Sequence, residues 1–247
     1  MTRSVQVIVL ACATALLLRL VVTDEYLYYV KPSMHWPIIL AAAVLGALTV
    51  FTALDAWRAT GGDEVPDGGT HDHDHAHGGD GHAHGEPRAA LLLALPLMAV
   101  LLIAPAPLGA FSAARTATPP PPSLLLGSLD ALPKTDPVDL PVSDFIRRTT
   151  EGDGASVKGR SVRLEGFVTP NPKGGWWLTR MIISCCAADA YAARIAVDGG
   201  GSLAANTWVR VTGTWVVGSG RSGGLMIPSL TASDVTTIPA PSNPYQR

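Results

Sequence analysis

The 247-residue chain lacks several features that would point to common activities. No stretch is rich in lysine and arginine, which argues against nucleic-acid binding, and the formal net charge of only −2 adds nothing on this point. Its three cysteines include no Cys-x-x-Cys pair, so the usual motif of a thiol redox enzyme is missing. We also find no Ser/His/Asp set, nucleotide-binding motif or phosphate-binding loop. We therefore expect a protein that is not an enzyme.

Histidine, by contrast, is concentrated in one polar stretch, because six of the seven histidines lie within residues 71–84. Neutral imidazole binds zinc, copper and nickel, and neighbouring carboxylates attract divalent cations. Alternate side chains of an extended chain share a face, so the first four imidazoles could meet on one ion. We predict a labile site for zinc or another divalent transition metal, with a passive solvated loop as the alternative. The predicted ligands are His71, His73, His75, His77, His82 and His84, assisted by Asp72, Asp74 and Asp80.

Three apolar segments lie in the first half of the chain. Residues 5–22 contain one charge, Arg19, near one end, where its side chain can reach the membrane surface. Residues 36–57 have a tryptophan at each boundary, as membrane spans often do. Residues 89–111 are interrupted by three prolines, which we expect to distort the helix. The pattern predicts three transmembrane helices.

Basic residues around these segments give a small bias in orientation. With the N-terminus inside, Arg3, Arg58 and Arg88 lie in the cytoplasm, against Lys31 and Arg115 on the opposite side. We therefore expect the histidine-rich loop in the cytoplasm and the C-terminal half outside it.

A proline-rich spacer divides the chain. Four consecutive prolines at 119–122 enforce an extended, semi-rigid connection. Residues 138–150 carry apolar side chains at helical spacing, which predicts a short helix. The expected domains are a membrane domain over 1–111 with a histidine-rich loop at 58–88, a linker over 112–137 and a soluble domain over 138–247.

Beyond this short helix, the pattern changes to strands separated by glycine-rich turns. Residues 161–168 alternate apolar and polar side chains, and Gly166 suggests a bulge or bend. Five such strands fit a small five-stranded OB-like β-barrel, with a two-sheet sandwich as the competing arrangement. The predicted strands cover residues 161–168, 176–184, 194–198, 208–217 and 225–235.

Cys185 and Cys186 are adjacent, and a disulfide between neighbours would need a strained ring. In a continuous strand their side chains face opposite ways, so one would enter the core and the other would face outward. If the strand ends at Ser184, a turn could aim both sulfurs and the Asp189 carboxylate at one soft cation. These donors fall short of a closed tetrahedral zinc site, so a further ligand would have to complete it.

Three motifs of the C-terminal half resemble those of a known family. They are Gly-Phe-Val at 166–168, Arg-x-x-Ile-x-Cys-Cys-x-x-Asp-Ala at 180–190 and Trp-x-x-Val-x-Gly at 208–213. With the N-terminal apolar segments and the histidine-rich loop, nearly the whole chain resembles the YcgQ-like family of bacterial two-component permease subunits. The resemblance implies a protein that works beside a separate polytopic permease, in connection with zinc or related metals. By position, it implies a functional cluster of Arg180, Cys185, Cys186 and Asp189.

These features lead to one functional expectation and one alternative. We expect a multi-pass protein of a bacterial cell membrane that serves as an accessory subunit of a permease for a divalent transition metal, zinc first. Three helices are too few to enclose a polar pathway, so a polytopic permease subunit is the expected partner, alongside the lipid bilayer. The alternative is an envelope-anchored OB-like interaction module whose histidine loop only buffers metal.

Overall fold

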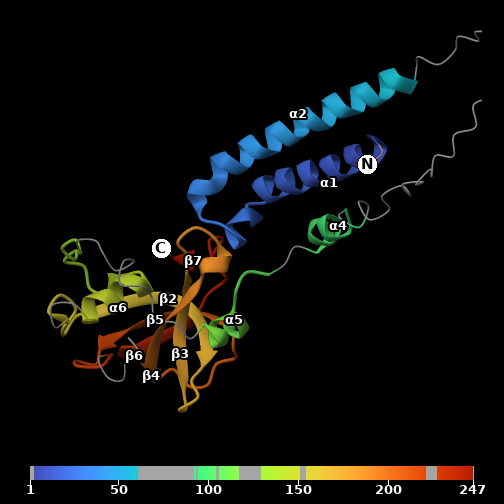
Figure 1. The fold of residues 1–247 in the computed structure, drawn as a ribbon. Coiled ribbons are helices and arrows are strands. Elements are labelled where there is room, and N and C mark those ends of the chain that lie inside the picture. Colours follow the sequence, from blue (N-terminus) through green and yellow to red (C-terminus); the bar gives the residue numbers. More distant parts are fainter. Residues whose placement is uncertain are drawn as a thin grey trace, which may run out of the picture. The chain divides into compact units, whose positions relative to one another are not determined.

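The computed structural model describes residues 3–60, 92, 94–103, 106–116, 129–150, 154–220 and 227–246 (Figure 1). The chain divides into two compact units. The helical unit contains residues 1–25 and 33–105, and the β unit contains residues 26–32 and 106–247. The segment Tyr26–Pro32 therefore belongs to the same unit as the strands, although it lies between the first two helices in the sequence.

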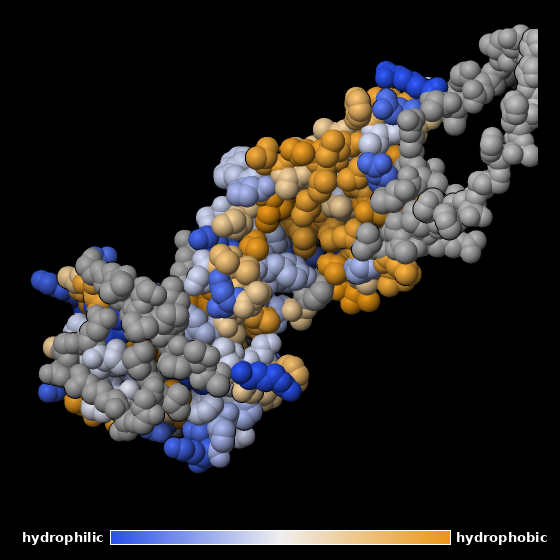
Figure 2. Space-filling view, in the orientation of Figure 1, coloured by the Kyte–Doolittle hydropathy of each residue, from blue (hydrophilic) through white to orange (hydrophobic). Residues whose placement is uncertain are grey.

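Two helices of the helical unit have the length and composition of membrane spans. They are α1, Arg3–Val22, and α2, His35–Thr60. Large apolar side chains on α2, such as Leu40 and Phe51, are 66% and 63% exposed. Figure 2 shows the corresponding apolar surface over the helices in orange. Helices that are apolar on all sides suit a lipid environment, so α1 and α2 support membrane association.

The prediction of a third transmembrane helix over residues 89–111 is wrong. Within that segment the structure has α4, Ala94–Leu102, and a separate short helix, α5, Ala110–Arg115, which belongs to the β unit. The nine residues of α4 rise by about 14 Å, roughly half the thickness of the hydrocarbon core. Pro107 lies in the non-helical stretch that precedes α5, and proline cannot donate the backbone hydrogen bond that a continuous helix needs.

The β unit contains a seven-stranded mixed sheet with the order β1-β2-β5-β6-β4-β3-β7 (Figure 1). An additional antiparallel pairing joins β2 to β3, which makes part of the sheet a ring. The pairs β1–β2, β4–β6 and β3–β7 are parallel, and the others are antiparallel. The strands are β1 (Val138–Asp139), β2 (Ser161–Pro170), β3 (Trp176–Ile182), β4 (Tyr191–Asp198), β5 (Trp208–Trp215), β6 (Ser229–Thr237) and β7 (Tyr245–Gln246).

The predicted five-stranded OB-like barrel is therefore corrected to a mixed seven-stranded sheet with a partial ring. The strands β2 to β6 overlap all five predicted ranges, so the error lies in strand number and closure. β1 and β7 have only two residues each. Strands this short show no alternation of apolar and polar residues, so a sequence pattern cannot reveal them.

Of the bulge or bend expected at Gly166, the pairing of the strands shows no bulge there. The pairing of β2 with β5 is continuous from Ser161 to Phe167, and the irregularity of the sheet lies instead at Thr212 and Gly213, between β5 and β6. A Cβ atom at position 166 would lie 2.6 Å from the carbonyl oxygen of Thr179. Glycine is therefore needed here because the β3 backbone approaches closely.

The core of the β unit lies between the sheet and helix α6, Val142–Thr150. This helix confirms part of the predicted helix over 138–150, whose first residues instead form β1. Phe145 of α6 packs in one cluster with Leu164 of β2 and Ile195 of β4, and all three are fully buried. Close packing of this core fixes the positions of the strands and therefore of the ends of the connections between them.

Candidate functional site

The neighbouring cysteines lie in the connection between β3 and β4, which we call the cysteine turn (residues 183–190). β3 ends at Ile182, and the chain then enters a short 3-10 helix, Ala187–Asp189, before β4 begins. Cys185 is exposed and Cys186 is partly buried, and both are free thiols. Of the two arrangements that the sequence allows, the structure therefore has the one in which a turn carries both cysteines.

The carboxylate of Asp189 organises this turn. Its Oδ1 accepts a hydrogen bond from the backbone N–H of Ser184 at 2.8 Å. Its Oδ2 accepts hydrogen bonds from the N–H groups of Cys185 at 2.7 Å and Cys186 at 3.4 Å. The Cys186 side chain accepts in return from the backbone N–H of Asp189, which completes a capping box. Local hydrogen bonds to a charged group thus hold the three side chains together.

Two sulfurs and one carboxylate converge in the cysteine turn. The Sγ atoms of Cys185 and Cys186 are 3.6 Å apart, and one ligand atom from each of these residues and Asp189 lies within 4.8 Å of the other two. Ligands of a tetrahedral zinc ion lie about 3.3–3.8 Å from one another, given bond lengths of about 2.0–2.3 Å. A small movement would therefore let these three atoms bind one ion.

The same contacts determine which of these groups carry protons. The hydrogen bond to Asp189, followed by the contact with Cys186, raises the pKa of the Cys185 thiol to about 11. Burial acts to raise the pKa of Asp189, but hydrogen bonds from the Cys185 thiol and from three backbone N–H groups outweigh it and lower that pKa. At neutral pH Asp189 is a carboxylate and Cys185 is a thiol, so an incoming metal ion would have to displace its proton.

The segment Tyr26–Pro32 contacts the cysteine turn through main-chain atoms. The N–H of Lys31 donates to the carbonyl of Cys185 at 3.2 Å, and the N–H of Ala187 donates to the carbonyl of Tyr29 at 2.7 Å. Val30 and Cys186 form an antiparallel bridge between these hydrogen bonds. The residues that connect α1 to α2 in the sequence therefore support the turn that carries the two thiols.

Arg180 is not among the three converging side chains. It lies on β3, is 7% exposed, and donates from Nη2 to the carbonyl of Asn243 at 2.9 Å. Its Cζ lies 4.6 Å from the centre of the Trp208 ring. Burial lowers the pKa of Arg180 to about 10, although the charge of Glu165 acts to raise it. The structure thus brings together three of the four residues of the expected functional cluster and places the fourth in a different environment.

The nine predicted ligands of the histidine-rich loop lie outside the described residues. They are His71, His73, His75, His77, His82, His84, Asp72, Asp74 and Asp80.

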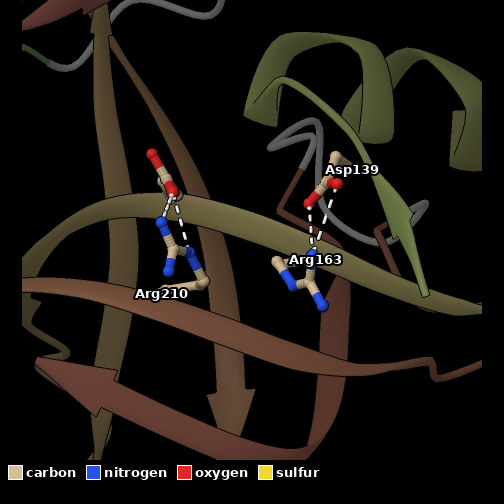
Figure 3. Close-up of polar contacts among 4 residues, drawn as sticks. Asp139, Arg163 and Arg210 are labelled. Carbon is tan, nitrogen blue, oxygen red and sulfur yellow. Dashed lines mark hydrogen bonds and ion pairs between the residues drawn. The ribbon is translucent and has the colours of Figure 1, made fainter. Parts of the chain in front are cut away.

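Sequence reasoning missed two ion pairs on the exposed face of β2. Arg163 donates to Asp139 of β1 at 3.1 and 3.3 Å, and Arg210 of β5 donates to Glu165 at 2.8 and 2.6 Å (Figure 3). The sequence does indicate these pairs, because Arg163 and Glu165 are two residues apart in a strand. Such residues share a face of the sheet and contact side chains on neighbouring strands.

Two regions of the chain match known domain families. Residues 5–117 match the DUF1980 N-terminal domain, and residues 151–246 match the DUF1980 C-terminal domain. The chain carries both DUF1980 domains. The N-terminal DUF1980 match contains both candidate membrane helices, and the C-terminal DUF1980 match contains the cysteine turn and Arg180. Comparison with curated proteins and with solved structures gives no match.

The family evidence thus extends to the two DUF1980 domains and no further. Their description names neither a YcgQ-like protein nor a permease.

Proposed function

We propose that this DUF1980 protein is an accessory subunit of a membrane permease and that its β unit binds a divalent transition metal, zinc first. The observation that carries the proposal is the convergence of Cys185, Cys186 and Asp189 within 4.8 Å on a turn with an exposed thiol. Thiolates favour zinc and softer transition metals over magnesium or calcium. Three protein ligands leave a fourth position for water or a ligand from a partner, which suits a site that passes its metal on.

The helices support the membrane part of the proposal. Both α1 and α2 have the composition of membrane spans, but two such helices are too few to enclose a polar pathway. A polytopic permease subunit in the same bacterial membrane would supply that pathway. The main-chain contacts of Tyr29 and Lys31 with the cysteine turn offer a physical connection, because a shift of the turn on metal binding would reach the segment between α1 and α2.

In this proposal the histidine-rich stretch at residues 71–84 is a second, weaker collecting site. Its imidazoles and carboxylates suit labile binding, whereas the cysteine turn offers thiolates. The two sites therefore have different ligand chemistry and can be told apart by experiment.

Cobalt(II) distinguishes them, because thiolate ligation adds a sulfur-to-cobalt charge-transfer absorption that imidazole and carboxylate ligation lack. We expect this absorption when the detergent-solubilised full chain is titrated with cobalt, and its loss on addition of zinc. Cys185→Ser, Cys186→Ser and Asp189→Asn should each weaken it strongly. Cys12→Ser, in α1, is the matched control and should leave it unchanged. Absence of the absorption in the parent protein, or its persistence in both Cys185→Ser and Cys186→Ser, would refute the metal site.

Replacement of the six loop histidines with asparagine should reduce the total zinc bound and leave the thiolate absorption intact. An unchanged zinc stoichiometry in that variant would show that the loop does not collect metal. Binding should strengthen as pH rises, since each thiolate ligand must first lose its proton.

The permease relationship needs a separate test in native membranes. Affinity purification of the full chain should recover a polytopic membrane protein, and Cys185→Ser should lower metal transport at unchanged abundance of both proteins. Recovery of the chain without such a partner would contradict the accessory role.

The basic residues motivate a proposal for the two sides of the membrane as well. A reporter fused after Arg247 should read as extracytoplasmic. Because Tyr26–Pro32 and the strands form one compact unit, a label attached to Lys31 should report the same side as Arg247. A cytoplasmic reading at both Lys31 and Arg247 would reverse the orientation, and different readings at the two positions would contradict a single compact unit.

A further inference from the structure

Arg180 is a buried cation of the β unit that forms no ion pair with a carboxylate among the described residues. The guanidinium of Arg180 uses Nη2 for the carbonyl of Asn243. Its Nε and Nη1 are buried and have no hydrogen-bond partner among the described residues. Burial of a cation with unused donors is unfavourable, so such groups are uncommon outside functional sites.

Arg180 forms part of the wall of a pocket of about 330 Å³. The charged residues that line this pocket with it are Asp139, Arg163 and Glu165, and the amide of Gln246 adds a further polar group. Leu140 and Pro141 line the rest. The pocket is therefore large enough for a small molecule and has mixed polar and apolar walls.

Both carboxylates of the pocket are already paired. Asp139 pairs with Arg163, and Glu165 pairs with Arg210, as the two sets of dashed lines in Figure 3 show. Within each pair the charges cancel. When the described pocket residues are counted with Arg210, the partner of Glu165, Arg180 is the one positive charge that no carboxylate cancels.

We propose that this pocket binds a small oxyanion, through a carboxylate or phosphate group, and that Arg180 is its principal binding residue. A guanidinium carries five N–H donors in one plane and forms strong, charge-assisted hydrogen bonds with the oxygens of either group. Because Arg180 lines the pocket, rotation of its side chain would turn an unused N–H toward a bound anion. The site is separate from the cysteine turn, so the inference does not depend on metal binding.

Arg194 shows that proximity to tryptophan alone does not create such a site. Its Cζ lies 5.2 Å from the centre of the Trp177 ring. However, its Nη2 donates to the carbonyls of Ala113 and Thr116, the latter at 3.1 Å. Two carbonyls thus accept from Nη2, and Arg194 has no buried donor without a partner among the described residues, so it is a matched control for Arg180.

Calorimetric titration of the detergent-solubilised full chain tests the proposal. One titration uses inorganic phosphate and the other uses acetate, with ionic strength held constant by chloride. We expect saturable binding in at least one titration, and the anion that saturates identifies the group recognised. Arg180→Gln should weaken this binding at least about tenfold, the loss expected for one charged hydrogen bond. Arg194→Gln should retain the parent affinity. Saturation by neither anion, or equal binding by Arg180→Gln and the parent, would overturn the proposal.

A second comparison leaves Arg180 in place. Asp139→Asn removes a negative charge from the pocket and should strengthen binding several-fold. Asp198→Asn makes the same change in net charge at the end of β4. Asp198 lies five residues beyond Ala193, the residue of β4 that pairs with Arg180 of β3. Binding to Asp198→Asn should match that of the parent. An equal gain in both variants would show that binding follows net charge alone and would also overturn the proposal.

Discussion

The helical unit and the β unit use the same apolar side chains in opposite ways. Leu40 of α2 is 66% exposed, whereas Leu164 of β2 is fully buried. In the helices, apolar residues continue around the whole circumference, while β4 and β5 alternate buried and less buried positions. The difference shows that apolar composition alone does not locate a protein core. Continuity over some twenty residues indicates a lipid environment, and alternation indicates a half-buried strand.

The largest effect should come from removing an apolar side chain in the two settings. Leu164→Ala should lower the free energy of unfolding of the β unit by about 2–5 kcal/mol, because it leaves a cavity in a packed core. Leu40→Ala should change it by less than about 0.5 kcal/mol. Urea unfolding of the detergent-solubilised chain, followed by tryptophan fluorescence, measures both. Similar losses of unfolding free energy in the two variants would show that apolar side chains stabilise the two units in the same way.

Replacement of an exposed valine by aspartate should affect the helical unit strongly and the β unit little. Val44 of α2 and Val217, which follows β5, are 52% and 56% exposed. Val44→Asp should cost about 2.5–3.5 kcal/mol of membrane insertion, since a charge near the centre of a span is unfavourable. Val217→Asp should have little effect because water already surrounds that position. The fraction of protein that resists alkaline extraction from membranes measures the difference, and equal extraction would show that α2 does not span the bilayer.

Two glycines give a smaller, matched contrast. A Cβ at Gly166 would meet the carbonyl oxygen of Thr179 at 2.6 Å, whereas one at Gly46 of α2 would meet Thr14 at 3.5 Å, an ordinary contact. Gly166→Ala should therefore destabilise the β unit by about 1–3 kcal/mol. Gly46→Ala should be neutral or stabilise the helix by up to about 1 kcal/mol. The same urea experiment tests Gly166→Ala, and helical content by circular dichroism tests Gly46→Ala. Parent-like stability of Gly166→Ala would show that the close approach is not needed.

The smallest effect should be electrostatic and confined to the cysteine turn. Because folding lowers the pKa of Asp189, its ionised form contributes stability that is fully present above its ordinary pKa, near 4, and is lost as pH falls through the lower folded value. Folding raises the pKa of Cys185 to about 11. The thiol form therefore contributes stability that is fully present below the ordinary pKa of cysteine and is lost as pH rises through about 11.

Asp189→Asn tests both parts of this dependence. The variant should be less stable than the parent at neutral pH by under about 1 kcal/mol, because the group is largely exposed to solvent. The difference should shrink as the parent is acidified below pH 4, and the loss of stability near pH 11 should move toward lower pH. Unfolding free energies at a series of pH values measure these changes. A difference that stays constant with pH would contradict the proposed ionisation.

The sequence predicts local elements of the β unit better than their assembly. β2 to β6 were predicted because alternation in each strand reflects one buried face, and glycine-rich turns mark their ends. The closure of the sheet depends instead on long-range pairings, such as Phe167 with Thr179 and Ala196 with Ser229, which strand patterns do not encode. The third membrane helix was wrongly predicted because total apolar length was given more weight than the prolines that interrupt it.

The candidate site was predictable in part for a similar reason. Cys185, Cys186 and Asp189 lie within five positions, so a single turn can bring them together, and the sequence motif marks them. Arg180 belongs to the same motif, but its surroundings come from distant segments that include Trp208 and Asn243. Its unused donors and its pocket could therefore be seen only in the folded chain.

The contact between the cysteine turn and Tyr26–Pro32 also limits how the sequence between α1 and α2 can change among relatives. Main-chain atoms of Tyr29 and Lys31 make these hydrogen bonds, so many side chains at these positions would preserve them. An inserted or deleted residue between α1 and α2 would instead shift the pairing of Val30 with Cys186. Relatives that retain this contact should therefore vary freely in the composition of this connection while keeping its length constant.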